Sequence, residues 1–160
     1  RAGRCRRRRD GSVCAVLKRI AVSTKTGLAG EFIVCAAILE LEGDWKVVHT
    51  PQDRIDVLAF NKAIFLRISV KTSRILTNPE GRRPNYHFQN GSGSKKKTLP
   101  DPKDVDIVAH CFLDDRKVAF YAAEQVRQYS QRRPMRYADD PHFEQNHWDR
   151  ALQIVQERMK

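Results

Sequence analysis

Apolar residues recur every three or four positions between Thr26 and Gly43, and this spacing predicts an amphipathic helix of about four turns. Thr26 is expected to be its N-cap, and Gly43 is a typical residue to end it. The repeating stripe consists of Leu28, Glu31, Phe32, Cys35, Ala36 and Leu39.

Short apolar or alternating runs follow this helix and predict strands. Asn61-Lys62 is expected to form a tight turn, so that the strands on either side of it make an antiparallel hairpin. The expected strands cover residues 45–49, 55–60, 64–72, 86–89, 105–113 and 117–122.

A second helix is predicted from Asp140-Pro141 onward. Its apolar face would hold Phe143, Trp148, Leu152, Val155 and Met159, with Trp148 in the core. Residues 78–102 are rich in proline and glycine and indicate a long loop around one short strand, whereas residues 128–140 indicate a polar connection. The order of elements predicts a single α/β domain with a mixed sheet flanked by helices.

The composition narrows the class of protein. The chain has 160 residues, of which 41% are hydrophobic, which is too many for a disordered chain. No apolar run approaches the roughly 18–20 residues of a membrane-spanning helix. The net charge of +11 favours a polyanionic partner, with nucleic acid first and an acidic membrane surface second.

This positive charge is concentrated in two places. Residues 1–20 hold eight basic residues and one acid, without periodicity, so we expect a disordered basic arm before a domain at 21–160. Such an arm is also compatible with binding to nucleic acid, to an acidic partner or to a membrane surface.

The second basic cluster, residues 62–97, holds nine basic residues and one acid. We expect part of it to grip phosphates of DNA, although a solvated loop tip is an equally simple interpretation for the lysines. The candidate DNA-binding residues are Arg67, Arg74, Arg82, Arg83, Lys95, Lys96 and Lys97.

The cysteines, Cys5, Cys14, Cys35 and Cys111, show neither the close pairing of a zinc site nor a disulfide framework. We expect free thiols and a reducing, cytoplasmic location. His110 and Cys111 lie in an apolar run and are expected to be buried strand residues.

Four polar residues contradict their surroundings. Glu31 lies on or beside the helical stripe, and Asp56 opens an apolar strand. Ser69 and Lys71 share one face of the next strand, and pairing through the Asn61 turn would bring them beside Asp56.

Two carboxylates and a lysine at one end of a hairpin suit phosphodiester hydrolysis, which needs a divalent cation, an activated water and positive charge near the phosphorus. Asp56 and Glu31 would be metal ligands, and Lys71 would orient or deprotonate water or stabilise the transition state. The simpler alternative for Asp56 and Lys71 is a structural salt bridge. Asp106 is a further candidate, for which we favour a structural hydrogen-bonding role.

These residues, in this order and spacing, resemble the PD-(D/E)XK nuclease superfamily. The resemblance covers roughly residues 24–155 and is greatest to the small branch with a glutamine-Xaa-lysine third motif, which includes a group I intron homing endonuclease and its phage and bacterial relatives. The matching segments are Gly30-Glu31, Arg54-Ile55-Asp56-Val57, Ile68-Ser69-Val70-Lys71-Thr72, Val105-Asp106-Ile107-Val108, Lys117-Val118-Ala119-Phe120-Tyr121 and His147-Trp148-Asp149-Arg150-Ala151-Leu152.

The resemblance implies a restriction-endonuclease-like core and Mg²⁺-dependent cleavage of DNA, with Mn²⁺ as a substitute, by a homing or junction-resolving enzyme. Ser69 departs from the family pattern, which has glutamate, aspartate or glutamine there, so the metal would be held by Asp56, Glu31, the Val70 carbonyl and water. A homodimer or higher homo-oligomer is expected because duplex and junction targets present two strands. Ser69 also supports the alternative of a catalytically inactive nucleic-acid-binding module of the same fold.

Overall fold

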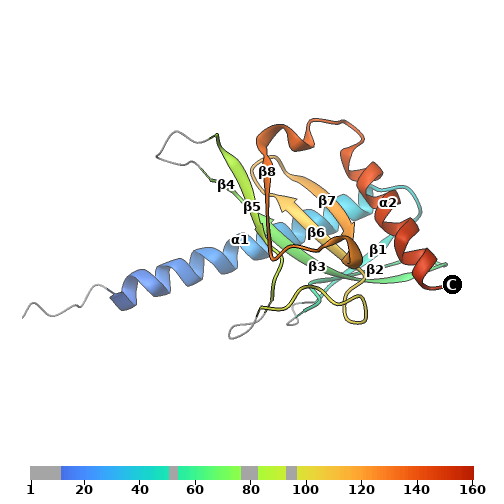
Figure 1. Cartoon of the computed structure of the whole chain (residues 1–160), viewed down its shortest axis with the longest axis horizontal. Helices are drawn as coiled ribbons and strands as arrows, with labels where there is room; N and C mark the ends of the chain where they lie inside the picture. The colour runs from blue at the N-terminus through green and yellow to red at the C-terminus, as the bar shows by residue number, and fades with distance from the viewer. Residues whose placement is uncertain (1–11, 51–53, 77–82, 93–96) are drawn as a thin grey trace, which may run out of the picture.

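A long helix, α1 (Ser12–Glu40), precedes a series of strands in the computed structural model of the chain (Figure 1). The structure describes residues 12–50, 54–76, 83–92 and 97–160, with side chains from residue 24 onward. The later elements are β1 (Lys46–His49), β2 (Val57–Phe60), β3 (Phe65–Ser73), β4 (Ile75–Leu76), β5 (Asn85–Gln89), β6 (Ile107–Phe112), β7 (Lys117–Ala122), η1 (Ala123–Gln125), β8 (Ser130–Pro134), η2 (Met135–Ala138) and α2 (Phe143–Arg158).

The main sheet has five strands in the order β1-β2-β3-β6-β7. β3 and β6 are parallel, and the other neighbours are antiparallel, so the predicted mixed sheet is confirmed. The predicted hairpin is also present: Asn61 donates its backbone N–H to the Ile64 carbonyl, and its side-chain oxygen accepts from the N–H of Ala63 and of Ile64. The Asn61 side chain therefore fixes the turn that sets the β2–β3 register.

Helix α1 differs from its prediction at both its start and its buried face. It begins at Ser12, so Thr26 lies inside the helix and the second half of the expected arm is helical, whereas residues 1–11 lie outside the described residues. The core side of α1 contains Gly30, Val34 and Ile38, and the expected apolar stripe points to solvent instead. The exposed members of that stripe include Leu28, Phe32, Ala36 and Leu39.

Gly30 explains which side of α1 faces the sheet. A Cβ atom added there would lie 1.9 Å from Thr72 Oγ1 and 2.8 Å from Thr72 Cβ, so the helix backbone crosses β3 at a distance that a larger residue prevents. A close crossing at this point turns Val34 and Ile38 toward the sheet, because they follow Gly30 at intervals of one helical turn. The hydrophobic pattern alone did not show this, since both sides of the helix are apolar.

α1 and α2 pack on the same face of the main sheet and share one core. Trp148 of α2 lies edge-on to Trp45 and to Phe120, with 4.9 Å between ring centroids in each pair, which confirms its core position. Phe143 and Val155 are also buried, but the prediction for Met159 is wrong: it follows the last helical residue and is 53% exposed.

A second sheet, in the order β4-β5-β8, covers the opposite face and stands to the left of the main sheet in Figure 1. Tyr86 and Phe88 of β5 point inward onto Phe112 of β6. β8 falls in the predicted polar connection, so that prediction is wrong. The inward position that an apolar residue would normally hold is occupied by Arg133, whose guanidinium lies 4.7 Å from the centroid of the Tyr137 ring.

The remaining expectations about buried residues hold in the part of the chain that the structure describes. His110 and Cys111 are fully buried on β6, and Cys35 and Cys111 are free thiols. Burial raises the pKa of Cys111 to about 12, so its thiol stays protonated. Among the described residues, no helix is both long and apolar enough to span a membrane.

Candidate active site at the end of the β2–β3 hairpin

The site is organised by Asp56, the residue just before β2. Its backbone N–H donates to the Ile68 carbonyl at 3.0 Å, although Ile68 is already the ladder partner of Val57. Two residues of one strand thus oppose one residue of the other, as in a β-bulge, which re-aims the first side chain. Asp56 Oδ2 accepts from the Val70 N–H at 2.5 Å and from Ser69 Oγ at 3.4 Å.

The Val70 carbonyl belongs to the same edge of β3. Within a strand, the N–H and C=O of one residue point to the same side, and the Val70 N–H points at Asp56 beyond the last ladder pair of β2 and β3. The backbone oxygen of Val70 is therefore directed toward the edge that carries the Asp56 carboxylate.

Glu31 reaches this edge from α1. The close crossing of Gly30 over Thr72 places Glu31 next to the part of β3 that carries Lys71. Glu31 Oε2 lies 2.5 Å from His49 Nε2 on β1, and the His49 ring lies 5.0 Å from the Phe32 ring. His49 is the ladder partner of Val57, so this contact ties the helix to the strand pair that ends at Asp56.

Charge in this region is poorly solvated. Burial raises the pKa of Asp56, and the Glu31 carboxylate adds to this, against the opposing effects of the Val70 N–H, the Lys71 ammonium and the Ser69 hydroxyl. Burial lowers the pKa of Lys71, while the Asp56 and Glu31 carboxylates oppose the shift. Both groups are therefore easier to neutralise than their free counterparts, which is common at catalytic sites.

Ser69 and Lys71 project from the face of β3 opposite α1, as the period of a strand requires. There they line a cavity of about 30 Å³ together with Asn90, Thr98 and other residues of the segment before β6. His110, the β6 neighbour of Lys71, is fully buried and contacts Asn90 Oδ1 through Nε2 at 2.7 Å. Burial lowers the pKa of His110 to about 3, so it brings no positive charge to the vicinity of Lys71.

The donors at this edge suit a hard divalent cation. They are the carboxylates of Asp56 and Glu31 and the Val70 carbonyl, and Mg²⁺ is commonly held by one or two carboxylates completed by water and substrate phosphate. The described residues contain no group of three or more histidine, cysteine, aspartate or glutamate side chains that could hold a metal ion by themselves. The donor set thus fits a metal shared with a phosphate rather than one enclosed by the protein.

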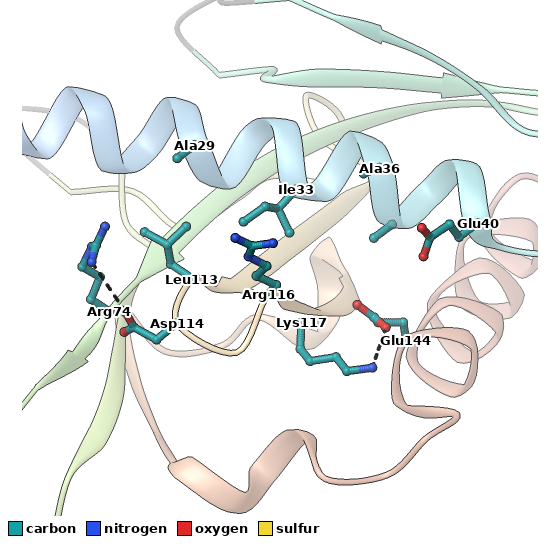
Figure 2. A pocket seen from close by; sticks show the side chains of 11 residues that line it. Ala29, Ile33, Ala36, Glu40, Arg74, Leu113, Asp114, Arg116, Lys117 and Glu144 are labelled. Carbon is teal, nitrogen blue, oxygen red and sulfur yellow. Dashed lines mark hydrogen bonds and ion pairs between the residues drawn. The ribbon is translucent and has the colours of Figure 1, made fainter.

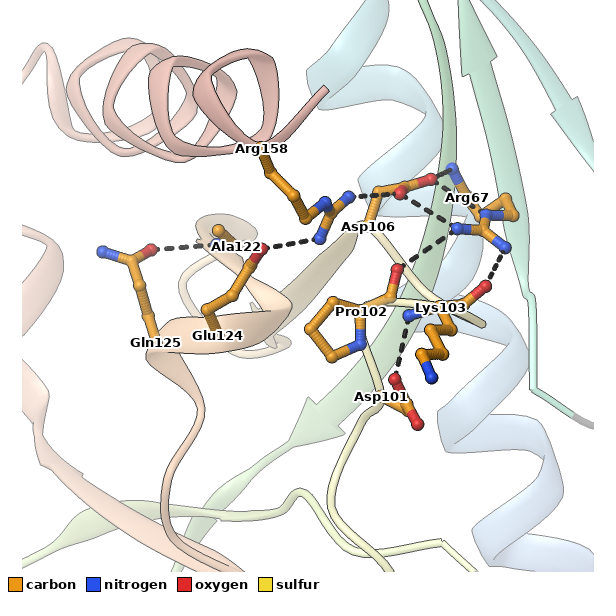
Figure 3. A network of polar contacts seen from close by, with 9 residues as sticks. All are labelled: Arg67, Asp101, Pro102, Lys103, Asp106, Ala122, Glu124, Gln125 and Arg158. Carbon is orange, nitrogen blue, oxygen red and sulfur yellow. Dashed lines mark hydrogen bonds and ion pairs between the residues drawn. The ribbon is translucent and has the colours of Figure 1, made fainter. Parts of the chain in front are cut away.

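Arg67, a predicted DNA contact, lies in a network of polar contacts (Figure 3). Its guanidinium donates to both oxygens of Asp106 and to the carbonyls of Pro102 and Lys103. Asp106 is 1% exposed and also accepts from Arg158 of α2 at 2.6 Å. The structural hydrogen-bonding role favoured for Asp106 is confirmed. Through Asp106, Arg67 of β3 and Arg158 of α2 are joined to the start of β6.

The other predicted DNA contacts are dispersed. Arg74 pairs with Asp114 at 3.6 Å, Lys97 donates to Gln89 Oε1 at 3.3 Å, and Arg83 is exposed. Arg82, Lys95 and Lys96 lie outside the described residues.

A larger hollow, of about 790 Å³, lies between α1 and the β6–β7 turn (Figure 2), and Asp56 does not line it. Two of its cations are paired with carboxylates, Arg74 with Asp114 and Lys117 with Glu144. A third cation, Arg116, also lines the hollow, so only part of its positive charge is neutralised by these pairs.

His49 is the residue of the site that the sequence did not reveal. It occupies a short edge strand at a half-buried position, and nothing in the spacing of apolar residues distinguishes it from a surface histidine. Its contact with Glu31 arises from the packing of α1 against β1.

The fold defines the class: an α/β domain with a mixed, restriction-endonuclease-like sheet. Among solved structures it is similar to a bacterial homing endonuclease, I-Ssp6803I, with a TM-score of 0.62, and the match covers 86% of this chain and 98% of that one. Sequence identity is 14%, so the likeness is one of fold. No family model and no curated protein matches the chain.

Proposed function

We propose that this protein is a divalent-metal-dependent endonuclease of the PD-(D/E)XK type that hydrolyses phosphodiester bonds in DNA, as a homing or junction-resolving enzyme. The observation that carries the proposal is the convergence of Asp56, Glu31 and Lys71 at one end of the β2–β3 hairpin. The Glu31 carboxylate affects the pKa of both Asp56 and Lys71, and Asp56 and Lys71 affect each other. The similarity of the fold to that of a homing endonuclease supports the same function.

Each group has a distinct part in the proposed reaction. Asp56, Glu31 and the Val70 carbonyl would hold Mg²⁺ or Mn²⁺, which when bound supplies Lewis-acid activation of water and of the phosphate. Lys71 lies beside these carboxylates and would orient the attacking water or accept its proton, which its lowered pKa favours. In its charged form it would stabilise the negative charge that develops on the phosphate.

In this proposal, Ser69 acts by positioning the Asp56 carboxylate. Its hydroxyl donates to Asp56 Oδ2, the oxygen that also accepts from the Val70 N–H. Ser69 would thus help to fix the rotamer of Asp56.

The test is cleavage of plasmid and branched DNA in the presence and absence of Mg²⁺. We expect wild-type protein to cleave and the Asp56→Ala and Lys71→Ala variants to lose about 100-fold or more. Lys117→Ala is the matched control, because Lys117 is also paired with a carboxylate but lies away from the site. Equal activity in wild type and both site variants would refute the proposed site.

The same experiment addresses the inactive alternative, which Ser69 favours. A module without catalysis would bind DNA in a salt-sensitive manner, show no metal-dependent cleavage, and bind equally well after Asp56→Ala. Binding without cleavage by wild-type protein would therefore replace the proposed enzyme with a binding module.

We also propose that the protein acts as a homo-oligomer. Leu28, Phe32 and Leu39 of α1 are 42–57% exposed, and Val48 of the edge strand β1 is 45% exposed. A second copy would bury such apolar side chains. The molar mass in solution, measured by light scattering, should be at least twice that of the chain and should fall in a Phe32→Glu variant, whereas a monomeric wild type would contradict the proposal.

A further inference from the structure

The outer face of the second sheet carries a set of side chains that the proposed active site does not use. Tyr86 and Phe88 of β5 are fully buried, so the alternating residues Asn85, His87 and Gln89 point outward. On β8, Ser130 and Arg132 are exposed. We call these five outward residues the ribbon face.

The ladder register groups the ribbon face tightly. His87 is paired with Arg132, and Gln89 with Ser130, so these pairs lie on the same side of the sheet. Gln89 Nε2 lies 3.3 Å from His87 Nε2. β4 pairs with Asn85 and Tyr86, and between His87 and Gln89 the described sheet is a two-stranded antiparallel ribbon of β5 and β8.

The chemistry of this face matches base edges. Asparagine and glutamine pair with adenine, and arginine pairs with guanine, each through two hydrogen bonds in the major groove. The major groove, about 12 Å wide, admits a two-stranded β-ribbon. The ribbon face contains no carboxylate, so it presents no negative charge to the phosphates that line the groove.

The inner face of the same strands gives a contrast. Arg133 points inward, where its guanidinium lies over Tyr137 and donates to Tyr121 Oη at 3.5 Å. Arg132 is the next residue, yet it is exposed and paired across the strands with His87. The two adjacent arginines thus have separate uses, one in packing and one on the surface.

The strand β5 also borders the candidate active site. Asn90 follows Gln89 directly and lines the small cavity that contains Lys71. The Lys97 ammonium donates to Gln89 Oε1 at 3.3 Å, which places a cation beside the ribbon face. β5 therefore contributes Gln89 to the ribbon face, and the next residue, Asn90, contributes to the wall of that cavity.

We infer that β5 and β8 enter the major groove of duplex DNA and that Arg132 and Gln89 read base edges there. The inference rests on the proposed function and adds to it the element that selects the sequence. Arg132 is expected to prefer guanine and Gln89 to prefer adenine.

The test selects bound sequences from randomised duplex DNA with the full-length protein in Ca²⁺, so that binding is measured without cleavage. Wild-type protein should enrich a defined sequence. Arg132→Ala and Gln89→Ala should each lose preference at one or two positions, by about tenfold or more in relative affinity, and keep the rest. The matched control is Arg150→Ala, which removes the same charge from an exposed position of α2.

Arg132→Lys separates base reading from charge. It retains the positive charge but lacks the two-pronged guanidinium, so it should bind DNA with nearly wild-type affinity and still lose the preference for guanine. Thermal melting of each variant should match wild type, since both residues are exposed.

Three results would overturn the inference. If both ribbon variants enrich the wild-type sequence, the ribbon does not read bases. If wild-type protein binds and cleaves DNA without preference, the proposed function stands and the ribbon has no reading role. If wild-type protein neither binds nor cleaves any DNA, both the proposed function and the inference are wrong.

Discussion

Replacing Gly30 with alanine should reduce both stability and cleavage, because this glycine sets the distance between α1 and β3. The added Cβ would lie 1.9 Å from Thr72 Oγ1, 2.7 Å from Cγ2 and 2.8 Å from Cβ. Rotation of the Thr72 side chain can move Oγ1 and Cγ2 but leaves its Cβ in place. Helix and strand must therefore move apart before the new atom fits.

The size of the effect follows from these distances. With Thr72 in its present rotamer, the distance from the new Cβ to Thr72 Oγ1 must increase from 1.9 Å to the 3.4 Å of ordinary van der Waals packing. If Thr72 rotates, the distance from the new Cβ to Thr72 Cβ must still increase from 2.8 Å. Overpacking of this kind costs about 1–3 kcal/mol, against about 1 kcal/mol that alanine contributes over glycine in a helix. We expect a net loss of about 0–2 kcal/mol, or up to roughly 8 °C in Tm, where an unobstructed alanine would give a gain.

The loss of activity should exceed what the lower stability explains. Glu31 follows Gly30 and moves with the helix, and a displacement of about 1 Å at a catalytic group can cost about 100-fold in rate. Cleavage is measured well below the Tm of the variant, so that the protein remains folded throughout.

Gly27 provides the matched control on the same helix. A Cβ there meets its nearest atom, Glu31 Oε1, at 4.0 Å, so Gly27→Ala should raise the free energy of unfolding by about 0.5–1 kcal/mol and leave cleavage intact. If Gly30→Ala is as stable and as active as Gly27→Ala, the close crossing does not position Glu31 and this reasoning is wrong.

Three further substitutions test other parts of the site and fold. Lys71→Met should abolish cleavage yet raise the Tm, because it removes a poorly solvated charge; a lower Tm would contradict this. His49→Ala should raise the Mg²⁺ concentration needed for half-maximal cleavage by about 10–100-fold, with partial recovery in His49→Gln; an unchanged requirement would show that Glu31 acts without His49. Asp106→Asn should lower the free energy of unfolding in urea by about 3–5 kcal/mol, since Arg67 and Arg158 lose a buried partner, and a loss below about 1 kcal/mol would show that the network is dispensable.

The fold could be predicted where a single local pattern determined it. The β2–β3 hairpin follows from alternation on both sides of Asn61, and its antiparallel register accounts for the closeness of Asp56, Ser69 and Lys71. β8 could not be predicted in this way, because its inward side chains are Gln131 and Arg133 and the strand depends on pairing with β5.

The position of Glu31 could not be predicted from the hydrophobic pattern. α1 is apolar on more than one side, and the side that is buried depends on how closely the helix can approach β3 at Gly30. The same packing creates the contact between Glu31 and His49, which no periodicity encodes. Residues brought together along one hairpin could therefore be predicted from sequence, whereas those brought together by helix packing required the structure.

The energetics of Asp56 and Lys71 connect this site to the stability of the fold. Because the pKa of Lys71 is lowered in the fold, the unfolded chain binds a proton that the folded one lacks between that pKa and 10.5, and stability rises with pH across this window. Because the pKa of Asp56 is raised, the folded chain keeps a proton between pH 3.8 and its own pKa, and stability falls as pH rises there. The lowered pKa of Lys71 and the raised pKa of Asp56 both mean that folding disfavours the charged forms of these side chains. A buried structural salt bridge shows the same balance when desolvation outweighs the attraction between its charges, so the cleavage assay of Asp56→Ala and Lys71→Ala decides between a reactive and a structural pair.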